Sequence, residues 1–512
     1  MCYVSMQQFF GKTFKESIVM AAILYGLGFL AYGWDMGTGI ILGLMFSSAF
    51  VAYKRLDRAM YLAFLELFIN PHGVLISASI GGFPLSLRMA IFIGILAGWG
   101  IGLLTRRYKL RRADLVDQPH FGLLILAAAM GLIIGTLSRD PAVVFADGNA
   151  YLYLLYLLPM LSVRWRPQQR HDLLQVLAAG AVWVSGLSLL LLYAFSHLDA
   201  SLLTPLYAFF RDLRIAEITA LEGGLYRVFV QSQIFVMLFG LTVLSMVGTG
   251  VRRSWLVGLG ALSFGIVLLS LSRSFWVGLT PAVLFMLWTL WRSHRPTTKQ
   301  TFGFVGWTLV AKIAAAVGLV AIVLFPFPPQ DLTSSALVDS LKERTTDSDD
   351  VAISSRWKLL WPMLGEIAQS PLVGHGFGAT VTFQTDDPRA RAINPDGTWT
   401  TYSMEWGWFE LWIKMGVIGP LAFLYAGWEL IRRLQRYRWT DQAWLGYALM
   451  AGVILIFATH VFSPYLNHPI GLGYLLFIVP FIANKKPATA TVEEFVPAPV
   501  KGTPAKALAS RQ

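Results

Sequence analysis

The sequence has a single cysteine and few charged residues. Cys2 stands alone among 512 residues, which excludes an internal disulfide, a thiolate zinc cluster and an iron–sulfur site. Only 14% of the residues are charged and 56% are apolar, a balance unlike that of a cytosolic globular enzyme. No GxSxG, HExxH or Walker A motif occurs, so the sequence lacks these signatures of serine hydrolases, zincins and ATPases. We expect neither a metal nor a cofactor.

Long apolar runs make up most of the chain. A membrane-spanning helix needs roughly 20 mostly apolar residues. We therefore predict an all-α, polytopic integral membrane protein with about 12–14 transmembrane helices. The predicted spans are residues 17–33, 36–53, 60–80, 85–104, 121–137, 149–163, 173–195, 228–247, 255–271, 275–291, 302–325, 406–430, 444–461 and 470–482.

Two of these spans need comment. The first follows Lys12 and Lys15 and has the pattern of a signal peptide, but a second apolar run follows without a convincing cleavage site, which favours a retained helix. The weak span at residues 60–80 contains Glu66, Asn70 and Pro71. Polar residues and proline at membrane depth indicate a broken or re-entrant segment.

The net charge of +12 is explained first by membrane topology. Lysine and arginine accumulate in short cytoplasmic loops, and strongly basic loops occupy residues 106–112, 164–170 and 432–438. With the N-terminus inside, every basic cluster falls on the cytoplasmic side, so both termini are predicted to be cytoplasmic. A nucleic-acid partner is not expected.

This topology predicts four segments. Residues 1–325 carry the N-terminal transmembrane helices, and residues 326–404 form one large periplasmic loop. Residues 405–483 carry the C-terminal helices. From residue 484 to residue 512 the chain is rich in Ala, Pro, Thr and Lys, which is typical of a disordered tail.

Three arginines on the predicted outer side depart from the positive-inside trend. Arg227 is predicted to open a helix, Arg273 to lie in a tight turn between two helices, and Arg356 to lie in the large loop. Any one of them can instead bind a carbonyl at a helix end or reach a lipid phosphate. As a cluster they suit a lipid diphosphate, because guanidinium groups bind phosphate oxygens bidentately and keep their charge.

Two further arginines, Arg211 and Arg214, are candidates for the same cluster. Asp212 and Glu217 lie close to them in the sequence, which favours local ion pairs as the role of these two arginines.

Carboxylates and one histidine complete the candidate site. Glu410 and Lys414 stand four residues apart and are predicted to form an ion pair. Glu405 has no partner nearby in the sequence, which makes it a candidate reactive carboxylate, with an interfacial carboxylate as the equal alternative. His375 lies in GHGFG, interpreted as a turn that packs the loop against the membrane domain, and is a lesser candidate for acid–base work.

Four segments carry a resemblance to the O-antigen ligase and polymerase superfamily of bacterial envelope enzymes, which includes Wzy-type polymerases. They are YRVFVQSQ from Tyr226, LSRSFWVGL from Leu271, SRWKLLWPMLGEIAQSPLVGHGFG from Ser355 and EWGWFELWIKMGVIGPLAF from Glu405. Together they cover the second half of the chain, from about residue 225 to about residue 430. In ligases of the superfamily the last segment usually begins with His-Asn, where this chain has Glu405 and Trp406. That departure favours a polymerase, and a carboxylate can also act as a general base.

The resemblance implies an inverting, metal-independent glycosyltransferase of GT-C-like architecture in the bacterial inner membrane. Its donor is a glycan on undecaprenyl diphosphate and its acceptor is a glycan, with a chain-length regulator as a possible partner. Glu405 would take the acceptor proton, and Arg273, Arg227 and Arg356 would bind the diphosphate. The residues proposed to contact substrate besides these are His375, Arg211, Arg214 and two aromatic residues for sugar stacking, Tyr402 and Trp406.

Three functions remain open. The first is polymerisation of O-antigen or exopolysaccharide repeat units. The second, within the same superfamily, is ligation of lipid-linked glycan to lipid A core or to protein. The third is a lipid-glycan transporter, which should show internal repeats and ionisable groups near the bilayer middle; no clear repeat is visible in the sequence.

Overall fold

The computed structural model describes residues 6–221, 225–251, 253–294, 297–327, 351–386 and 388–483. The predicted tail, residues 484–512, lies outside these ranges, as do residues 328–350 of the large loop. The boundaries of the four predicted segments stay predictions.

The described chain is helical, with eight helical stretches long and apolar enough to cross a membrane. This confirms the predicted fold class. Seven of these stretches are single helices: α1 (Lys12–Gly33), α2 (Gly37–Lys54), α4 (Leu87–Leu104), α6 (Pro119–Ser138), α9 (Pro167–His197), α13 (Arg273–His294) and α14 (Thr298–Leu324). The eighth joins α7 (Pro141–Gly148), η2 (Asn149–Tyr156) and α8 (Leu157–Ser162). Four shorter apolar helices are α11 (Gln233–Gly248), α12 (Trp255–Ser270), α20 (Ala443–Thr459) and α21 (Pro469–Ile482).

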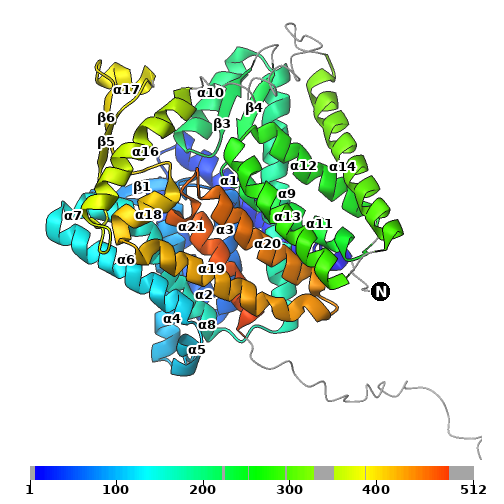
Figure 1. The fold of residues 1–512 in the computed structure, drawn as a ribbon, viewed down its shortest axis with the longest axis horizontal. Coiled ribbons are helices and arrows are strands. Elements are labelled where there is room, and N and C mark those ends of the chain that lie inside the picture. The colour runs from blue at the N-terminus through cyan, green and yellow to red at the C-terminus, as the bar shows by residue number, and fades with distance from the viewer. Residues whose placement is uncertain are drawn as a thin grey trace, which may run out of the picture.

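Helices that are buried on every side lie in the middle of the molecule. Every residue of α21 from Ile470 to Ile482 is buried, and so is nearly all of α3 (Leu56–Ile69). Figure 1 shows both helices in the centre of the bundle and α14 at its edge. The side chains of Phe302 and Val317 on α14 are strongly exposed, as expected for a helix whose outer face contacts lipid.

The weak span predicted at residues 60–80 is broken, as its sequence indicates. Helix α3 ends at Ile69, and the antiparallel hairpin of β1 (Ser77–Ile80) and β2 (Phe83–Ser86) follows. Buried Glu66 accepts hydrogen bonds from Arg88 at 3.0 Å and Asn70 at 2.9 Å. The ion pair with Arg88 compensates the charge of Glu66, which a continuous span would have placed in lipid.

The expected helix at residues 228–247 begins later than predicted, so Arg227 does not open a helix. It lies in β4 (Tyr226–Phe229), which pairs with β3 (Glu217–Ala220), with Thr219 opposite Arg227. Helix α11 begins only at Gln233, whose side chain bonds to the Val230 N–H and to the Val228 carbonyl oxygen. These two bonds occupy backbone groups just before the helix and fix its start.

The span predicted at residues 406–430 is two helices rather than one. They are α18 (Gly407–Met415) and α19 (Ile418–Leu434), and they are separated at Gly416, which has φ of +64°. A Cβ atom at Gly416 would lie 2.1 Å from the carbonyl oxygen of Leu372. The break therefore lets the large loop approach the chain closely, which only glycine permits.

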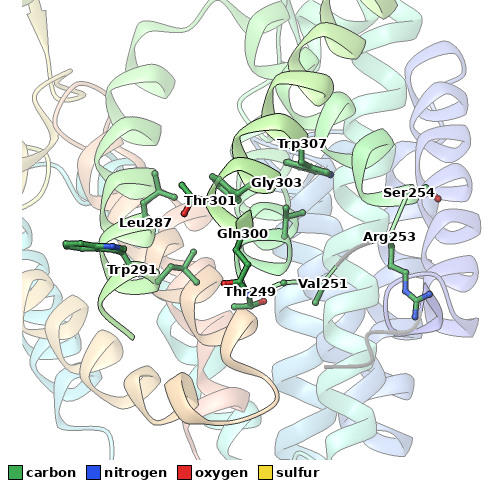
Figure 2. Close-up of a pocket in the computed structure, with 15 residues that line it drawn as sticks. Thr249, Val251, Arg253, Ser254, Leu287, Trp291, Gln300, Thr301, Gly303 and Trp307 are labelled. Atoms are coloured by element: carbon green, nitrogen blue, oxygen red, sulfur yellow. The ribbon is translucent and has the colours of Figure 1, made fainter. Parts of the chain in front are cut away.

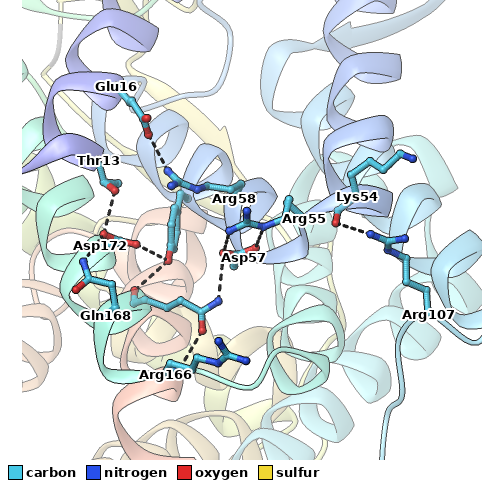
Figure 3. A network of polar contacts seen from close by, with 12 residues as sticks. Thr13, Glu16, Lys54, Arg55, Asp57, Arg58, Arg107, Arg166, Gln168 and Asp172 are labelled. Atoms are coloured by element: carbon cyan, nitrogen blue, oxygen red, sulfur yellow. Dashed lines mark hydrogen bonds and ion pairs between the residues drawn. The ribbon is translucent and has the colours of Figure 1, made fainter. Parts of the chain in front are cut away.

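The predicted basic clusters meet at one end of the helices, called here the basic end. Arg58 bonds to Glu16 at 2.7 Å, and Arg107 donates to the Lys54 carbonyl oxygen at 3.0 Å (Figure 3). Further bonds at this end join Thr13 to Asp172, Arg433 to the Asp117 carbonyl oxygen and Arg438 to Ser293. The clusters thus share one side of the bundle, as a positive-inside topology requires; the orientation of that side in a membrane stays a prediction.

The opposite end, called here the loop end, carries the described parts of the long connections. These are α10 (Ala200–Asp212), the β3–β4 hairpin, α16 (Val351–Gln369), β5 (Val381–Gln384), α17 (Pro388–Ile393) and β6 (Thr398–Thr401). Figure 1 shows them along the side away from the N-terminus. Strands β5 and β6 pair antiparallel. A separate apolar cluster that includes Leu359, Met363, Val381 and Met404 packs this region against α18.

Candidate active site

Arg356 and Glu405 form an ion pair at the loop end. The Arg356 Nε–H, on α16, donates to Oε2 of Glu405, which lies just before α18. The side chains are 26% and 49% exposed, so the pair stays open to solvent and to a substrate. The sequence placed these two residues in one candidate site without predicting that they would pair.

Trp406 anchors the backbone of Arg356 next to Glu405. Its indole N–H donates to the Arg356 carbonyl oxygen at 2.8 Å, and its ring contacts Trp357 and Phe462 with centroids 5.4 and 5.1 Å away. Only 8% of Trp406 is exposed. Little of the ring is therefore available for the predicted stacking on a sugar, whereas Tyr402 is exposed on the same segment.

Arg227 contacts the turn before Arg273 at a second place on the loop end. The Arg227 Nε–H donates to the Ser270 carbonyl oxygen at 2.8 Å, at the end of α12. Leu271 then turns the chain in the left-handed region, with φ of +44°, and Arg273 begins α13. The predicted tight turn at Arg273 is present, and the hydrogen bond from β4 brings Arg227 to it.

The loop that follows α20 lies between these two places. Phe462 packs on Trp406, and Tyr465 packs on Phe275 of α13 with centroids 6.2 Å apart. Phe275 in turn contacts Phe229, two residues after Arg227. One short loop therefore contacts the neighbours of both arginine groups, which places Arg227, Arg273 and Arg356 around the same end of α13 and α20.

Arg211 is engaged in a local ion pair. It bonds to Asp212 at 2.9 Å and lies over the ring of Tyr207, and Asp212 also accepts from the Tyr32 hydroxyl at 2.9 Å. The bond from Arg211 lowers the pKa of the Asp212 carboxyl. Arg214 is exposed, in the turn between α10 and β3. The local ion pair expected for Arg211 is therefore present, with Asp212 as its partner.

His375 packs the GHGFG turn against the bundle. Its N–H donates to the Ile413 carbonyl oxygen at 2.6 Å, and its ring Nε2 lies 2.9 Å from the Glu366 carbonyl oxygen. Arg139, beyond α6, donates to the His375 carbonyl oxygen. A Cβ atom at the next residue, Gly376, would lie 2.3 Å from the backbone nitrogen of Gly135. The predicted packing turn is confirmed, and these contacts hold His375 in a structural position.

A buried group of three charges involves α18, the helix that follows Glu405. Lys414 pairs with Glu410, as predicted, and also with Asp147 of α7. The three side chains are almost fully buried, and Asp147 also accepts from the Gly378 N–H at 2.7 Å. The group fastens α18 and the GHGFG turn to the membrane bundle. Sequence reasoning missed Asp147 because it lies far from Lys414 along the chain.

A histidine pair at the same end was also missed. The rings of His72, after the break in α3, and His468, at the start of α21, have centroids 5.7 Å apart. His468 Nδ1 accepts from the Ile470 N–H at 3.3 Å. Neither histidine belongs to a motif, so only the three-dimensional fold brings them together. Within the described ranges, no group of three or more His, Cys, Asp or Glu residues suits a metal ion.

Two sizeable cavities lie at the basic end, away from the candidate residues. One, of about 620 Å³, is lined by Trp291, Trp307, Thr249 and Arg253, among others, from α13, α14 and the α11–α12 connection (Figure 2). The other, of about 880 Å³, is lined by the basic segments after α4 and α8. The candidate site is instead a set of partly exposed charged groups at the loop end, outside both cavities.

The fold and these charged groups define a multi-pass helical membrane protein with arginines and a carboxylate gathered at one end. Residues 258–424 match the O-antigen ligase family, which confirms the resemblance to the O-antigen ligase and polymerase superfamily. The matched region contains Arg273, Arg356 and Glu405. It supports an O-antigen ligase or polymerase type of function, and the family implies lipid-linked oligosaccharide substrates in general. Comparison with curated proteins and with solved structures gives no match.

Proposed function

We propose that the chain polymerises O-antigen or exopolysaccharide repeat units from undecaprenyl-diphosphate-linked donors at the periplasmic face of the bacterial inner membrane. The observation that carries this proposal is the ion pair between Arg356 and Glu405, two residues 49 positions apart. A cation suited to phosphate and a carboxylate suited to a hydroxyl proton meet there, at the exposed loop end.

The reaction needs no nucleotide because the lipid diphosphate is already a good leaving group. An acceptor sugar hydroxyl attacks the anomeric carbon of the donor, the new C–O bond forms, and the bond from that carbon to the phosphate oxygen breaks. The electron pair leaves with undecaprenyl diphosphate, whose charge the guanidinium groups of Arg227, Arg273 and Arg356 stabilise. A single displacement inverts the anomeric centre.

Glu405 takes the proton of the attacking hydroxyl in this scheme. Arg356 donates to Oε2 of the carboxylate, and Oε1 is the atom that takes the acceptor proton in this scheme. A donor diphosphate offers Arg356 a more highly charged partner than Glu405. Donor binding therefore draws Arg356 towards phosphate and releases the carboxylate for general-base work.

The experiment that tests the function supplies purified, reconstituted protein with one polyprenyl-diphosphate oligosaccharide repeat, with and without lipid A core. Products are resolved by size. A ladder from the repeat alone supports a polymerase. A single addition that requires the core acceptor would replace polymerase by ligase, and movement of unreacted repeat across the bilayer would replace both by a transporter.

A further inference from the structure

Many of the residues that line the cavity of about 880 Å³ at the basic end are charged. Arg107, Lys109 and Arg111 come from the connection between α4 and α5 (Arg112–Val116), and Arg164 and Arg166 come from the connection between α8 and α9. Two carboxylates, Asp114 and Asp117, also line it. Positive charge is thus in excess around a space large enough for a small molecule.

The walls of this cavity are fixed by bonds to neighbouring elements. Arg107 donates to the Lys54 carbonyl oxygen and lies 5.3 Å from the ring centroid of Tyr53, as Figure 3 shows for the Lys54 contact. The Tyr108 hydroxyl donates to the Ala52 carbonyl oxygen at 2.7 Å. On the other wall the Trp165 indole donates to the Met160 carbonyl oxygen at 2.9 Å. Because these walls are already ordered, a ligand that binds in the cavity does not have to order them first.

Much of the positive charge in the cavity is uncompensated. Among the residues that the structure describes, Lys109, Arg111 and Arg164 form no ion pair with a carboxylate. All three are exposed. Their charges are therefore available to an anion that enters the cavity.

The cavity lies where the apolar surface of the bundle ends. Helix α4 ends at Leu104, three residues before Arg107, and the side chains of Ile101 and Leu104 are 50% and 85% exposed. An exposed apolar face of this kind on a spanning helix contacts acyl chains. A ligand with a phosphate group and acyl chains fits both surfaces at once, whereas a soluble anion would use only the charged one.

We propose that this cavity binds the phosphate headgroup of an anionic phospholipid, whose acyl chains lie along Ile101 and Leu104 of α4. Basic pockets at the helix ends of membrane proteins are known to bind such headgroups. Arginine suits the headgroup phosphate because it donates two parallel hydrogen bonds. The site is separate from the candidate active site and does not depend on the proposed function.

The test compares two double variants of the full chain in detergent. Arg111→Gln with Arg164→Gln removes two charges that line the cavity. Arg106→Gln with Arg112→Gln removes two exposed charges from the same basic segment that do not line it. Binding of fluorescent phosphatidylglycerol is measured for both, and native mass spectrometry counts the bound lipid. Thermal unfolding of each variant verifies that it is folded.

The cavity variant is expected to bind phosphatidylglycerol about tenfold to thirtyfold more weakly than the parent. The control variant should change by less than about threefold. Equal weakening in both variants would show only general surface attraction and would overturn the proposal. Equal affinity for phosphatidylcholine would also overturn it, as would complete displacement of the lipid by millimolar glycerol phosphate, which would indicate a soluble phosphorylated ligand.

Discussion

At the scale of single residues, exposure distinguishes the proposed reactive pair from the buried charges near it. Arg356 and Glu405 keep part of their surface open, whereas Glu410, Lys414 and Asp147 are almost fully buried. Exposure divides these five charged groups into those that can reach a substrate and those that stabilise the fold. The sequence predicts which residues are charged, but it does not predict this division.

Replacing Glu405 by Gln removes the proposed proton acceptor while keeping the size of the side chain. Transfer should fall by at least about a hundredfold, the usual contribution of a general base. Product formation by reconstituted protein measures it. Full turnover in this variant would mean that another residue takes the proton.

Replacing Arg273 or Arg356 by Ala removes a proposed phosphate contact. Each variant should lose most of its glycan transfer while its amount in the membrane is unchanged. Arg292→Ala is the matched control, because Arg292 is exposed near the other end of α13, the helix that Arg273 begins. Near-normal transfer by both site variants would remove the diphosphate-binding role.

Lys414→Met should destabilise the fold by roughly 3–5 kcal/mol, because it leaves two carboxylates buried without a cation. Lys12→Met removes the cation of another pair with the same spacing, Lys12–Glu16, whose lysine is 85% exposed. This control should change stability by less than about 1 kcal/mol. Denaturant unfolding in detergent measures both. Equal small effects would contradict the structural role of the buried group.

At the scale of elements, hydropathy located most helices but not the short irregular pieces. The sequence cannot distinguish a short strand such as Tyr226–Phe229 from the first turn of a helix, because four residues show no clear periodicity. Nor does it show that Gly416 breaks a span, since that break depends on contact with Leu372. The break after Glu66 was predictable, because Asn70 and Pro71 are polar or helix-breaking residues inside an apolar run.

The GHGFG turn offers a test of how closely the large loop must approach the bundle. Gly376→Ala should displace the turn, because the residue has φ of +79° and no room for a Cβ atom beside Gly135. We expect lower stability and reduced transfer. Gly365→Ala on α16 meets no atom within 4 Å and should be neutral or slightly stabilising. If Gly376→Ala behaves like this control, the close packing is not required.

The large loop should loosen in acid. The ion pair with Lys358 lowers the pKa of the Asp386 carboxyl, and Arg391 adds to the effect. A carboxyl whose folded pKa is lowered stabilises the fold above its ordinary pKa of 3.8, and this contribution disappears as pH falls through the lowered value. Limited proteolysis of the loop against pH measures it. Asp386→Asn should weaken the pH dependence, and an unchanged profile would contradict the assignment.

At the scale of the whole molecule, the charge pattern carried the most information. Basic clusters scattered along the sequence meet at one end of the bundle, and the candidate arginines lie at the other. The fold class and this polarity followed from composition and loop charge. The pairing of Arg356 with Glu405 did not, because it depends on how the large loop folds back over the helices.

Orientation in the membrane is tested by thiol labelling in a Cys2→Ser background. Thr400 and Gln442 are exposed at the loop end and the basic end, respectively. Thr400→Cys should react with an impermeant thiol reagent on intact spheroplasts, and Gln442→Cys only after the membrane is opened. The reverse pattern would invert the proposed topology and place the candidate site in the cytoplasm.

Arg356 and Glu405 are proposed to act on substrate, beyond forming a structural ion pair. The most direct measurement exchanges the two charges, comparing Arg356→Glu, Glu405→Arg and the double variant for glycan transfer by reconstituted protein. The double variant is expected to regain the thermal stability lost by the single variants but to form no product. Recovery of transfer together with stability would show that the pair is only structural.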